Sequence, residues 1–84
     1  YVGALPDYSG GGAGVKLLGV VEHGPAERAG LRAGDRVIKL SGREIGGVED
    51  YVGGVREASP GERVEMTVVR QGVPASVSFV PERR

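Results

Sequence analysis

Glycine and proline divide this chain into short apolar runs, and this punctuation limits the folds it can adopt. Sixteen of the 84 residues are glycine and five are proline. The glycines follow no three-residue period, which excludes a collagen-like helix. The runs between them are of strand length and rich in β-branched residues, which favours strands joined by tight turns. The five runs are 2–5, 15–21, 36–40, 63–70 and 75–80.

The last two runs predict a β-hairpin. Val64, Met66 and Val68 alternate with more polar positions, so they share one face of a strand. Gln71 and Gly72 separate this run from the next one, and such a pair is a hairpin signal of moderate strength. We therefore expect the two runs to pair antiparallel, with the face that carries Met66 turned to the core.

Two helices interrupt the strands. The segment 25–30 is short, with Pro25 suited to its first position and Gly30 suited to a left-handed stop. The segment 48–58 is longer and has one apolar face. Two adjacent glycines inside it cost about 1 kcal/mol each relative to alanine. Its apolar residues, spaced i, i+3, i+4 and i+7, are Val48, Tyr51, Val52 and Val55.

The expected order is strand, strand, short helix, strand, long helix, strand, strand. Such an arrangement predicts a small α+β domain in which an antiparallel sheet forms a partly open barrel or sandwich. A chain of 84 residues suits one domain, which at this size buries about 60% of the surface that its unfolded form exposes. Because the only methionine is Met66, we interpret residues 1–84 as a single domain excised from a longer protein.

Composition excludes several classes of function. Eleven basic residues balance eleven acidic ones, which argues against nucleic-acid binding and against a polybasic membrane surface. No apolar run approaches the 18 residues or so of a spanning helix, so we expect no membrane insertion. The chain has no cysteine, so disulfides and thiol chemistry are excluded.

A glycine-rich segment, 9–14, invites comparison with phosphate-binding loops. The lysine that follows, Lys16, has neither the spacing nor the Ser or Thr neighbour of a Walker A loop. A dinucleotide-binding loop should open a helix, whereas a strand-like run follows here. We therefore interpret this segment as a flexible connector.

Catalytic residues are also hard to assemble. His23 is the only histidine, and it precedes a turn, so a two-histidine metal site is excluded. A triad of His23 and Asp35 with Ser9 or Ser41 is possible by residue type only, because no nucleophile-elbow motif is present. Asp7 and Asp35 are a thin basis for acid–base chemistry, and Asp35 better suits a turn. We predict no catalytic residue, no metal site and no cofactor in this domain.

The residue pattern leaves two interpretations of the apolar positions at the start of the chain and on the long helix. A glycine-containing strand entry at 2–4 and an amphipathic helix at 48–58 could enclose an extended peptide, bound by strand addition. Successive backbone N–H groups around a glycine could also hold a terminal carboxylate. Alternatively, Val2, Leu5 and the helix face are ordinary core.

The stretch GPAERAGLRAGDRVIKLSGREI (24–45) resembles the signature of PDZ domains, and PGERVEMTVVRQG (60–72) is similar to the family's late hairpin. The resemblance covers essentially the whole chain. It implies a PDZ-like fold in the permuted strand order of bacterial members. In that order the C-terminal strand, here 75–80, is the neighbour of the ligand-binding loop.

The resemblance also implies a site. Its carboxylate-binding loop has the form apolar-glycine-apolar, which corresponds to Val2, Gly3 and Ala4. A groove would lie between residues 4–8 and the helix at 48–58, with Tyr51 either on the groove face or turned into the core. The expected groove residues are Leu5, Pro6, Asp7, Val48, Tyr51, Val52 and Val55.

Two residues depart from the family's pattern. Ala4 replaces a bulkier residue after the glycine, so the pocket for a terminal side chain should be wide. Pro6 stands where the binding strand normally offers an N–H to the ligand, and proline has none. One lost main-chain hydrogen bond costs about 0.5–1.5 kcal/mol, or up to about tenfold in affinity.

The segment LPDY (5–8) followed by a glycine-rich link resembles PDZ domains attached to bacterial zinc-dependent aminopeptidases, with HtrA-like serine proteases as the second choice. Either parent would hold the catalytic residues, and any zinc, outside this chain, and would place it outside the cytoplasm. The first functional hypothesis is a non-catalytic module that binds a peptide or protein C-terminus, or an extended segment. The alternative is a structural module that docks on the parent's catalytic domain and binds no free peptide.

Overall fold

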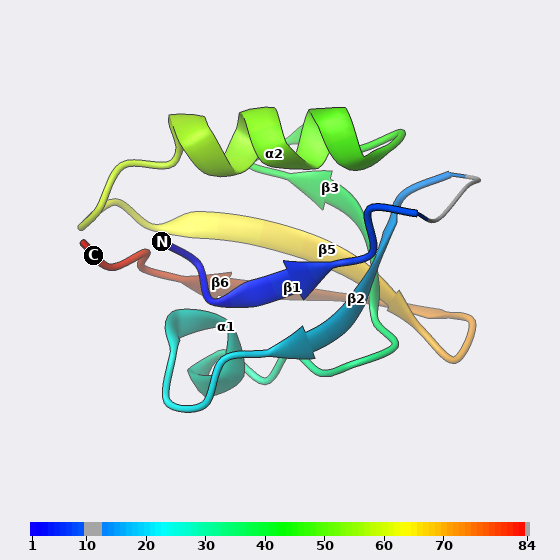
Figure 1. Cartoon of the computed structure of the whole chain (residues 1–84), viewed down its shortest axis with the longest axis horizontal. Coiled ribbons are helices and arrows are strands. Elements are labelled where there is room, and N and C mark those ends of the chain that lie inside the picture. Colours follow the sequence, from blue (N-terminus) through cyan, green and yellow to red (C-terminus); the bar gives the residue numbers. More distant parts are fainter. Residues whose placement is uncertain (10–12, 84) are drawn as a thin grey trace.

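The computed structural model describes residues 1–9 and 13–83, in which six strands and two helices form (Figure 1). The expected order of elements is confirmed, with one addition, the two-residue strand β4. The strands are β1 (Ala4–Pro6), β2 (Val15–Val20), β3 (Arg36–Leu40), β4 (Arg43–Glu44), β5 (Val64–Arg70) and β6 (Val73–Phe79). The helices are α1 (Pro25–Arg28) and α2 (Val48–Glu57). The glycine segment 9–14 lies partly outside the described residues, so the connector interpretation stays a prediction.

All strand pairs of the sheet are antiparallel, and the order is β1-β2-β3-β5-β6, with β4 paired to β3. The two ends of this order, β1 and β6, do not pair with each other, so the sheet is open rather than a closed barrel. Helix α2 lies above β1 in Figure 1, whereas α1 lies below the start of β1, on the opposite side of that strand. The α+β fold with a partly open antiparallel sheet is therefore confirmed.

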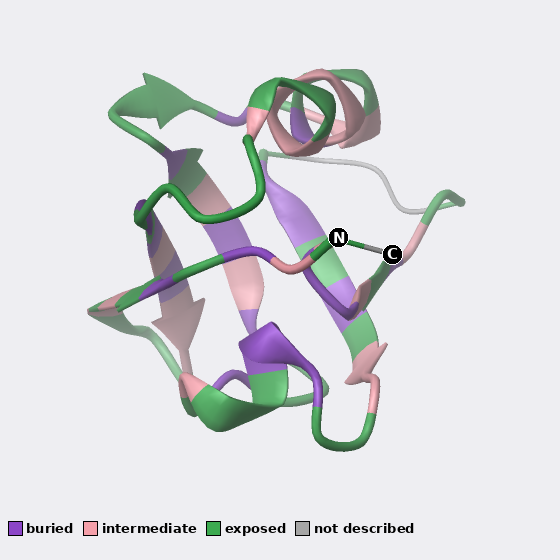
Figure 2. Ribbon diagram, turned by 90° about the vertical axis from the view of Figure 1, so that its left-hand side faces the viewer, coloured by how far each residue is buried: buried purple, intermediate pink, exposed green. Residues whose placement is uncertain are grey.

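One detail of the expected pairing is wrong. The C-terminal strand β6 pairs with β5 along its whole length and is not the strand neighbour of the loop at 2–4. The segment after β6 reaches that loop instead, because the N–H of Glu82 donates to the C=O of Tyr1 at 3.0 Å. The two termini consequently lie close together (Figures 1 and 2).

The hairpin of β5 and β6 is confirmed. Arg70 pairs with Val73, so the turn between them is the two residues Gln71 and Gly72, with φ of 52° and 79°. Positive φ at both positions is the geometry of the tight turn that matches strand twist. The second strand begins two residues earlier than expected and includes Pro74.

The core is formed mainly by strand residues, and in Figure 2 the purple, buried segments alternate with pink and green ones along several strands. Met66, Val68, Val37 and Leu17 are fully buried at its centre. The expected inward face of β5 is thereby confirmed. Removing such a side chain costs about 2–5 kcal/mol, because the lost burial is joined by a cavity.

The glycine pair inside α2 has a packing explanation at one of its two positions. A Cβ on Gly54 would lie 2.5 Å from Cδ2 of Leu40, which is closer than carbon atoms approach. The same atom on Gly53 would meet nothing within 4 Å. Gly54 therefore lets the helix approach β3, and the helical penalty of that glycine is offset by packing.

Candidate functional site

The loop at Val2–Ala4 is held by its carbonyl groups. The C=O of Val2 accepts from the N–H of Ala26 at 2.9 Å, and the C=O of Gly3 accepts from the N–H of Val21 at 2.7 Å. Among the hydrogen bonds of residues 1–9 and 13–83, none uses the N–H of Val2 or of Gly3 as donor. Gly3 has φ +80°, a left-handed conformation that also occurs in anion-binding nests.

The start of α1 explains why this loop adopts that shape. Gly24 is the residue before the helix, and Pro25 occupies its first turn, where a missing N–H is harmless. The next residue, Ala26, is fully buried, and its N–H is one of the donors that a helix start leaves without an internal partner. The loop supplies that partner. A Cβ on Gly24 would lie 3.6 Å from Cα of Gly3 and 3.2 Å from a backbone oxygen, so a side chain there would crowd the loop.

A cavity of about 260 Å³ opens between this loop, β1 and α2. It brings together most of the residues expected from the sequence: Val2, Gly3, Ala4, Leu5, Pro6, Tyr51, Val52 and Val55. Asp7 and Val48 are not among its lining residues, so the expected groove is shorter at that end. Whether any of these residues contacts a ligand stays a prediction.

Four further residues line the cavity that were not among the expected groove residues, namely Tyr1, Tyr8, Val21 and Arg56, although Tyr8 and Arg56 lie in the two segments, 4–8 and 48–58, between which the groove was expected. Arg56 could have been found from helical spacing, because it follows Val52 by four residues and therefore lies on the same side of α2. Tyr8 lies beyond the end of β1, and no spacing rule applied to it. Tyr1 precedes the apolar-glycine-apolar pattern, so the pattern did not include it.

The exposed edge of β1 faces this cavity with only one N–H. The C=O of Gly3 and the N–H of Asp7 both bond to the β2 side, the latter to the C=O of Lys16 at 2.9 Å. Alternate residues of a strand direct their backbone groups to opposite sides, so Ala4 and Pro6 face away from β2. The irregular register between Leu5 and Pro6 places the extra residue on β2, which preserves this alternation on β1. Pro6 therefore removes a donor from the cavity side.

The sequence left open whether Tyr51 lies on the groove face or in the core. In the structure it belongs to the core and also lines the cavity. Its side chain is only 3% exposed. Burial raises the pKa of Tyr51 to about 12, and the nearby Tyr8 adds to the rise. The phenol is therefore neutral at physiological pH and can donate or accept a hydrogen bond.

The two main residues considered for catalysis have other surroundings: one is exposed to solvent, and the other is held by an ion pair. The side chain of His23 is 87% exposed and lies 3.3 Å from Glu22. Asp35 accepts two hydrogen bonds from Arg70, at 2.7 and 2.6 Å, and one from the N–H of Arg32 at 3.1 Å. The pair with Arg70 holds the pKa of the Asp35 carboxyl below its usual range. Asp35 therefore closes a turn and anchors β5.

The described part of the chain also offers no metal site, because residues 1–9 and 13–83 contain no group of three or more His, Cys, Asp or Glu side chains suited to one. Nor does any helix in these ranges have the length and apolar character needed to cross a membrane.

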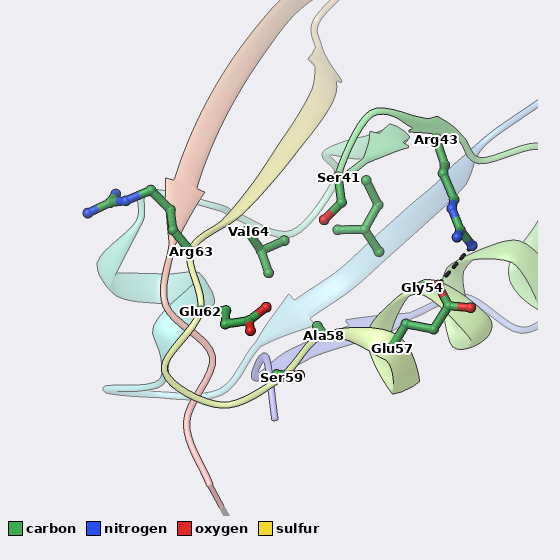
Figure 3. Close-up of a pocket in the computed structure, with 10 residues that line it drawn as sticks. Ser41, Arg43, Gly54, Glu57, Ala58, Ser59, Glu62, Arg63 and Val64 are labelled. Atoms are coloured by element: carbon green, nitrogen blue, oxygen red, sulfur yellow. Dashed lines mark ion pairs between the residues drawn. The ribbon is translucent and has the colours of Figure 1, made fainter.

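A second hollow, of about 210 Å³, lies on the opposite side of α2 (Figure 3). Ion-paired Arg43 and Glu57, 2.8 Å apart, stand at one rim, and Arg63 points away from it. Glu62 and Ser41 add further polar groups. No residue of the loop at 2–4 or of β1 lines this hollow, so it does not contain the strand and the N–H groups that suit an extended peptide in the first cavity.

The chain belongs to the PDZ family. The family model described as PDZ domain matches residues 17–70, which include most of β2 and all of α1, β3, β4, α2 and β5. A probable periplasmic serine endoprotease, DegP-like, from Ectopseudomonas mendocina is 41% identical over 63 residues, covering 71% of this chain and 13% of that protein. The regulator of sigma-E protease RseP from Escherichia coli is 35% identical over 68 residues, covering 81% of this chain and 15% of that protein.

Solved structures extend the likeness to the whole chain. The HtrA-type protease AlgW with decapeptide matches 100% of this chain and 29% of its own, with a TM-score of 0.88 and 23% identity. An aminopeptidase N family protein from Idiomarina loihiensis matches 92% of this chain and 13% of its own, with a TM-score of 0.76 and 23% identity. At these identities the likeness concerns the fold. Both parent types expected from the sequence thus contain this fold, and the chain spans about one seventh of its curated relatives.

Proposed function

We propose that this domain binds the C-terminal segment of a peptide or protein by strand addition to β1, without catalysing a reaction. The observation that carries the proposal is the pair of N–H groups of Val2 and Gly3, two residues that line the cavity, because no acceptor among the described residues engages these groups. A carboxylate there would supply the missing acceptors. The rest of the peptide would extend along the exposed edge of β1, opposite α2.

The proposal is supported by the backbone N–H groups of the loop at 2–4. Val2 and Gly3 are buried, and buried backbone donors are nearly always paired in folded proteins. Hydrogen bonds to an ionised acceptor are about twice as strong as neutral ones, so a carboxylate suits these donors better than a carbonyl. The AlgW structures that resemble this chain contain a decapeptide or a tripeptide, which supports a peptide as the ligand class.

The proposal is tested by amide titration of the ¹⁵N-labelled 84-residue chain. The probe is an acetylated pentapeptide of alanines ending in phenylalanine, with a free carboxylate. We expect the amide signals of Val2, Gly3 and Leu5, and those of α2, to shift together along one saturable curve. Shifts of neither region at millimolar peptide would refute the proposal.

The width of the terminal pocket gives a second test of the same site. Because Ala4 lines the cavity with a single methyl group, we expect a terminal phenylalanine to bind more tightly than a terminal valine. In Ala4→Leu a terminal valine should bind more tightly than a terminal phenylalanine, because leucine adds about three carbon atoms to the wall of the terminal pocket. Unchanged preference in this variant would show that the terminal side chain lies elsewhere.

A second candidate function is supported by Pro6. A module that docks on its own parent protein gains from the ring at this edge, because proline discourages uncontrolled strand pairing. In this case the cavity accepts a segment of the parent, or nothing. The titration above separates the two functions, because a docking module leaves the amides of the loop unmoved.

We further propose that the parent protein is a bacterial peptidase with its catalytic residues outside this chain. The relatives named as proteases, one of them described as periplasmic, support this context and an extracytoplasmic location. A zinc-dependent aminopeptidase is the preferred parent because of LPDY at 5–8, and an HtrA-like serine protease is the second. Mass spectrometry of the native protein, recovered with an antibody to this domain, would identify the parent.

A further inference from the structure

Strand β6 forms an open edge of the sheet, at the end of the strand order opposite to β1. On one side it pairs with β5 over seven residues, whereas β1 has only three residues. Between residues of the described ranges, 1–9 and 13–83, no hydrogen bond is formed by the backbone groups on its other side. No residue of β6 lines the cavity beside β1, so this is a second strand edge, separate from the proposed peptide groove.

The turn that precedes β6 determines which of its backbone groups point outward. Arg70 and Val73 flank a two-residue loop, so they exchange both hydrogen bonds of their pair. From there, alternate residues of the strand direct their backbone groups to β5 and to the open side. The outward residues are Pro74, Ser76 and Ser78. Because proline has no N–H, the two serines supply the outward donors.

This edge has few of the features that usually prevent strands from pairing. Residues 73–80 contain no charged side chain, and the pairing of β6 with β5 is regular, without a bulge. The serine hydroxyls bond to β5 and do not compete for the outward backbone groups. The Oγ of Ser76 lies 3.1 Å from Oγ1 of Thr67, and the Oγ of Ser78 accepts from Arg63 at 3.1 Å. The protecting residue that remains, Pro74, lies at one end of the edge.

We infer that β6 pairs antiparallel with β6 of a second copy of this chain, about a two-fold axis at Val77. In this register Ser76 of each copy faces Ser78 of the other, so all four outward N–H groups of the two serines donate to outward C=O groups. An axis at Ser76 or at Ala75 would place the ring of Pro74 against the carbonyl of a serine, which excludes both registers. An axis at Ser78 would place Ser76 opposite residue 80, past the end of β6.

The side chains also match themselves in this register. On one face of the strand, serine meets serine. On the other face, Val77 meets its own copy, and Ala75 meets Phe79 of the second copy. Ala75 and Val77 are only half-buried against the core, so the second copy would cover apolar surface that the single chain leaves open. No like charges meet across the axis, because residues 73–80 have none. This self-match favours a second copy as the occupant of the edge.

The first test measures the mass of the 84-residue chain by sedimentation equilibrium from micromolar to millimolar concentration. We expect a weak dimer, because one strand edge buries less surface than a standard interface. Ser76→Pro removes two of the four hydrogen bonds and should weaken the dimer about 5- to 150-fold. Ser76→Ala is the matched control, because it loses the same hydroxyl but keeps the N–H, and it should stay within about twofold of the wild type. The N–H of Ser76 is not used by β5, so circular dichroism should show both variants to be folded.

The second test places a single thiol on the axis. Residues that face each other without sharing hydrogen bonds have Cα atoms about 4.5 Å apart, which suits a disulfide. The chain has no cysteine, so Val77→Cys carries one thiol only. In oxidised glutathione, Val77→Cys should form a disulfide-linked dimer at least about tenfold faster than Val73→Cys. Val73 is the stricter control because it is 64% exposed, yet the two copies of it lie at opposite ends of the paired strands.

Three results would overturn the inference. One is a wild type that stays monomeric up to millimolar concentration, which would leave the edge to a different protein or to solvent. Another is an equal loss of the dimer in Ser76→Pro and Ser76→Ala. The third is cross-linking of Val77→Cys no faster than that of Val73→Cys, and this outcome decides the question even if Ser76→Pro does not fold. None of these measurements requires a peptide, so the inference fails or holds independently of the proposed function.

Discussion

Replacing Pro6 by alanine should tighten peptide binding, although it removes part of the protein's own packing. The alternation of backbone groups along β1 turns Ala4 and Pro6 to the cavity side, and only the first has an N–H. An alanine at position 6 therefore adds one main-chain donor to an edge that lacks it. A net hydrogen bond of about 0.5–1.5 kcal/mol corresponds to about two- to tenfold in dissociation constant.

The same change should destabilise the folded chain. Replacing proline raises the entropy of the unfolded state, at about 0.4–1 kcal/mol. The ring is buried, and alanine removes two carbon atoms from it, at about 0.8 kcal/mol each. We thus expect a loss of about 2–3 kcal/mol in the free energy of unfolding, together with the gain in affinity for the free-acid pentapeptide.

Calorimetric titration measures the affinity, at a temperature where circular dichroism shows each variant to be fully folded. Pro74→Ala is the matched control, because Pro74 is also a strand proline but lies on β6, away from the cavity. It should change stability through the unfolded state and leave peptide affinity unchanged. An affinity of Pro6→Ala equal to or weaker than the wild type would refute the assignment of this edge as the one to which the ligand adds.

Two further predictions concern stability. Gly53→Ala should raise the free energy of unfolding by about 1 kcal/mol. The free energy of unfolding of Gly54→Ala should be about 1–3 kcal/mol lower than that of Gly53→Ala, because the added methyl group displaces Leu40. Urea unfolding measures both variants, and equal values would contradict the close approach of α2 to β3. Arg70→Met should cost about 2–3 kcal/mol at neutral pH, because it leaves the buried carboxylate of Asp35 without its main partner. The folded-state pKa of Asp35 lies below its usual value of 3.8, so the pair's contribution is complete above about pH 4 and is lost as the pH falls through the lower folded value. Unfolding measured across acidic pH should therefore show a steeper loss of stability in the wild type than in Arg70→Met, and parallel curves would contradict this role.

Much of the fold could be predicted because local signals agree with it. The β5–β6 turn is specified by two residues with positive φ, and the buried face of β5 follows from strict alternation at Val64, Met66 and Val68. Strand pairing over long separations has no such local signal. For that reason the expectation that the C-terminal strand also neighbours the loop at 2–4 is wrong, and the two-residue strand β4, with both residues exposed, was not expected.

The site could be predicted in part for a similar reason. The loop residues and the apolar side of α2 follow from a motif and from helical spacing. At the far end of the cavity, the N–H of Asp7 bonds to β2, and the exposed Tyr8 lines the cavity instead. No rule of spacing links Tyr8 to α2, because their approach is a tertiary contact.

Residues inside the matched family segment hold the loop at 2–4 in place, whereas two residues of the proposed groove, Ala4 and Pro6, lie outside that segment. Gly24 and Ala26 fix the loop through a close backbone approach and a hydrogen bond to Val2, so they are needed for the fold whether or not a ligand binds. The matched family segment begins at residue 17 and therefore omits Ala4 and Pro6. Selection on ligand binding can alter these two positions without disturbing the scaffold. A wide terminal pocket and one missing donor would make the proposed groove depend more on the ligand's carboxylate than on pairing along the strand.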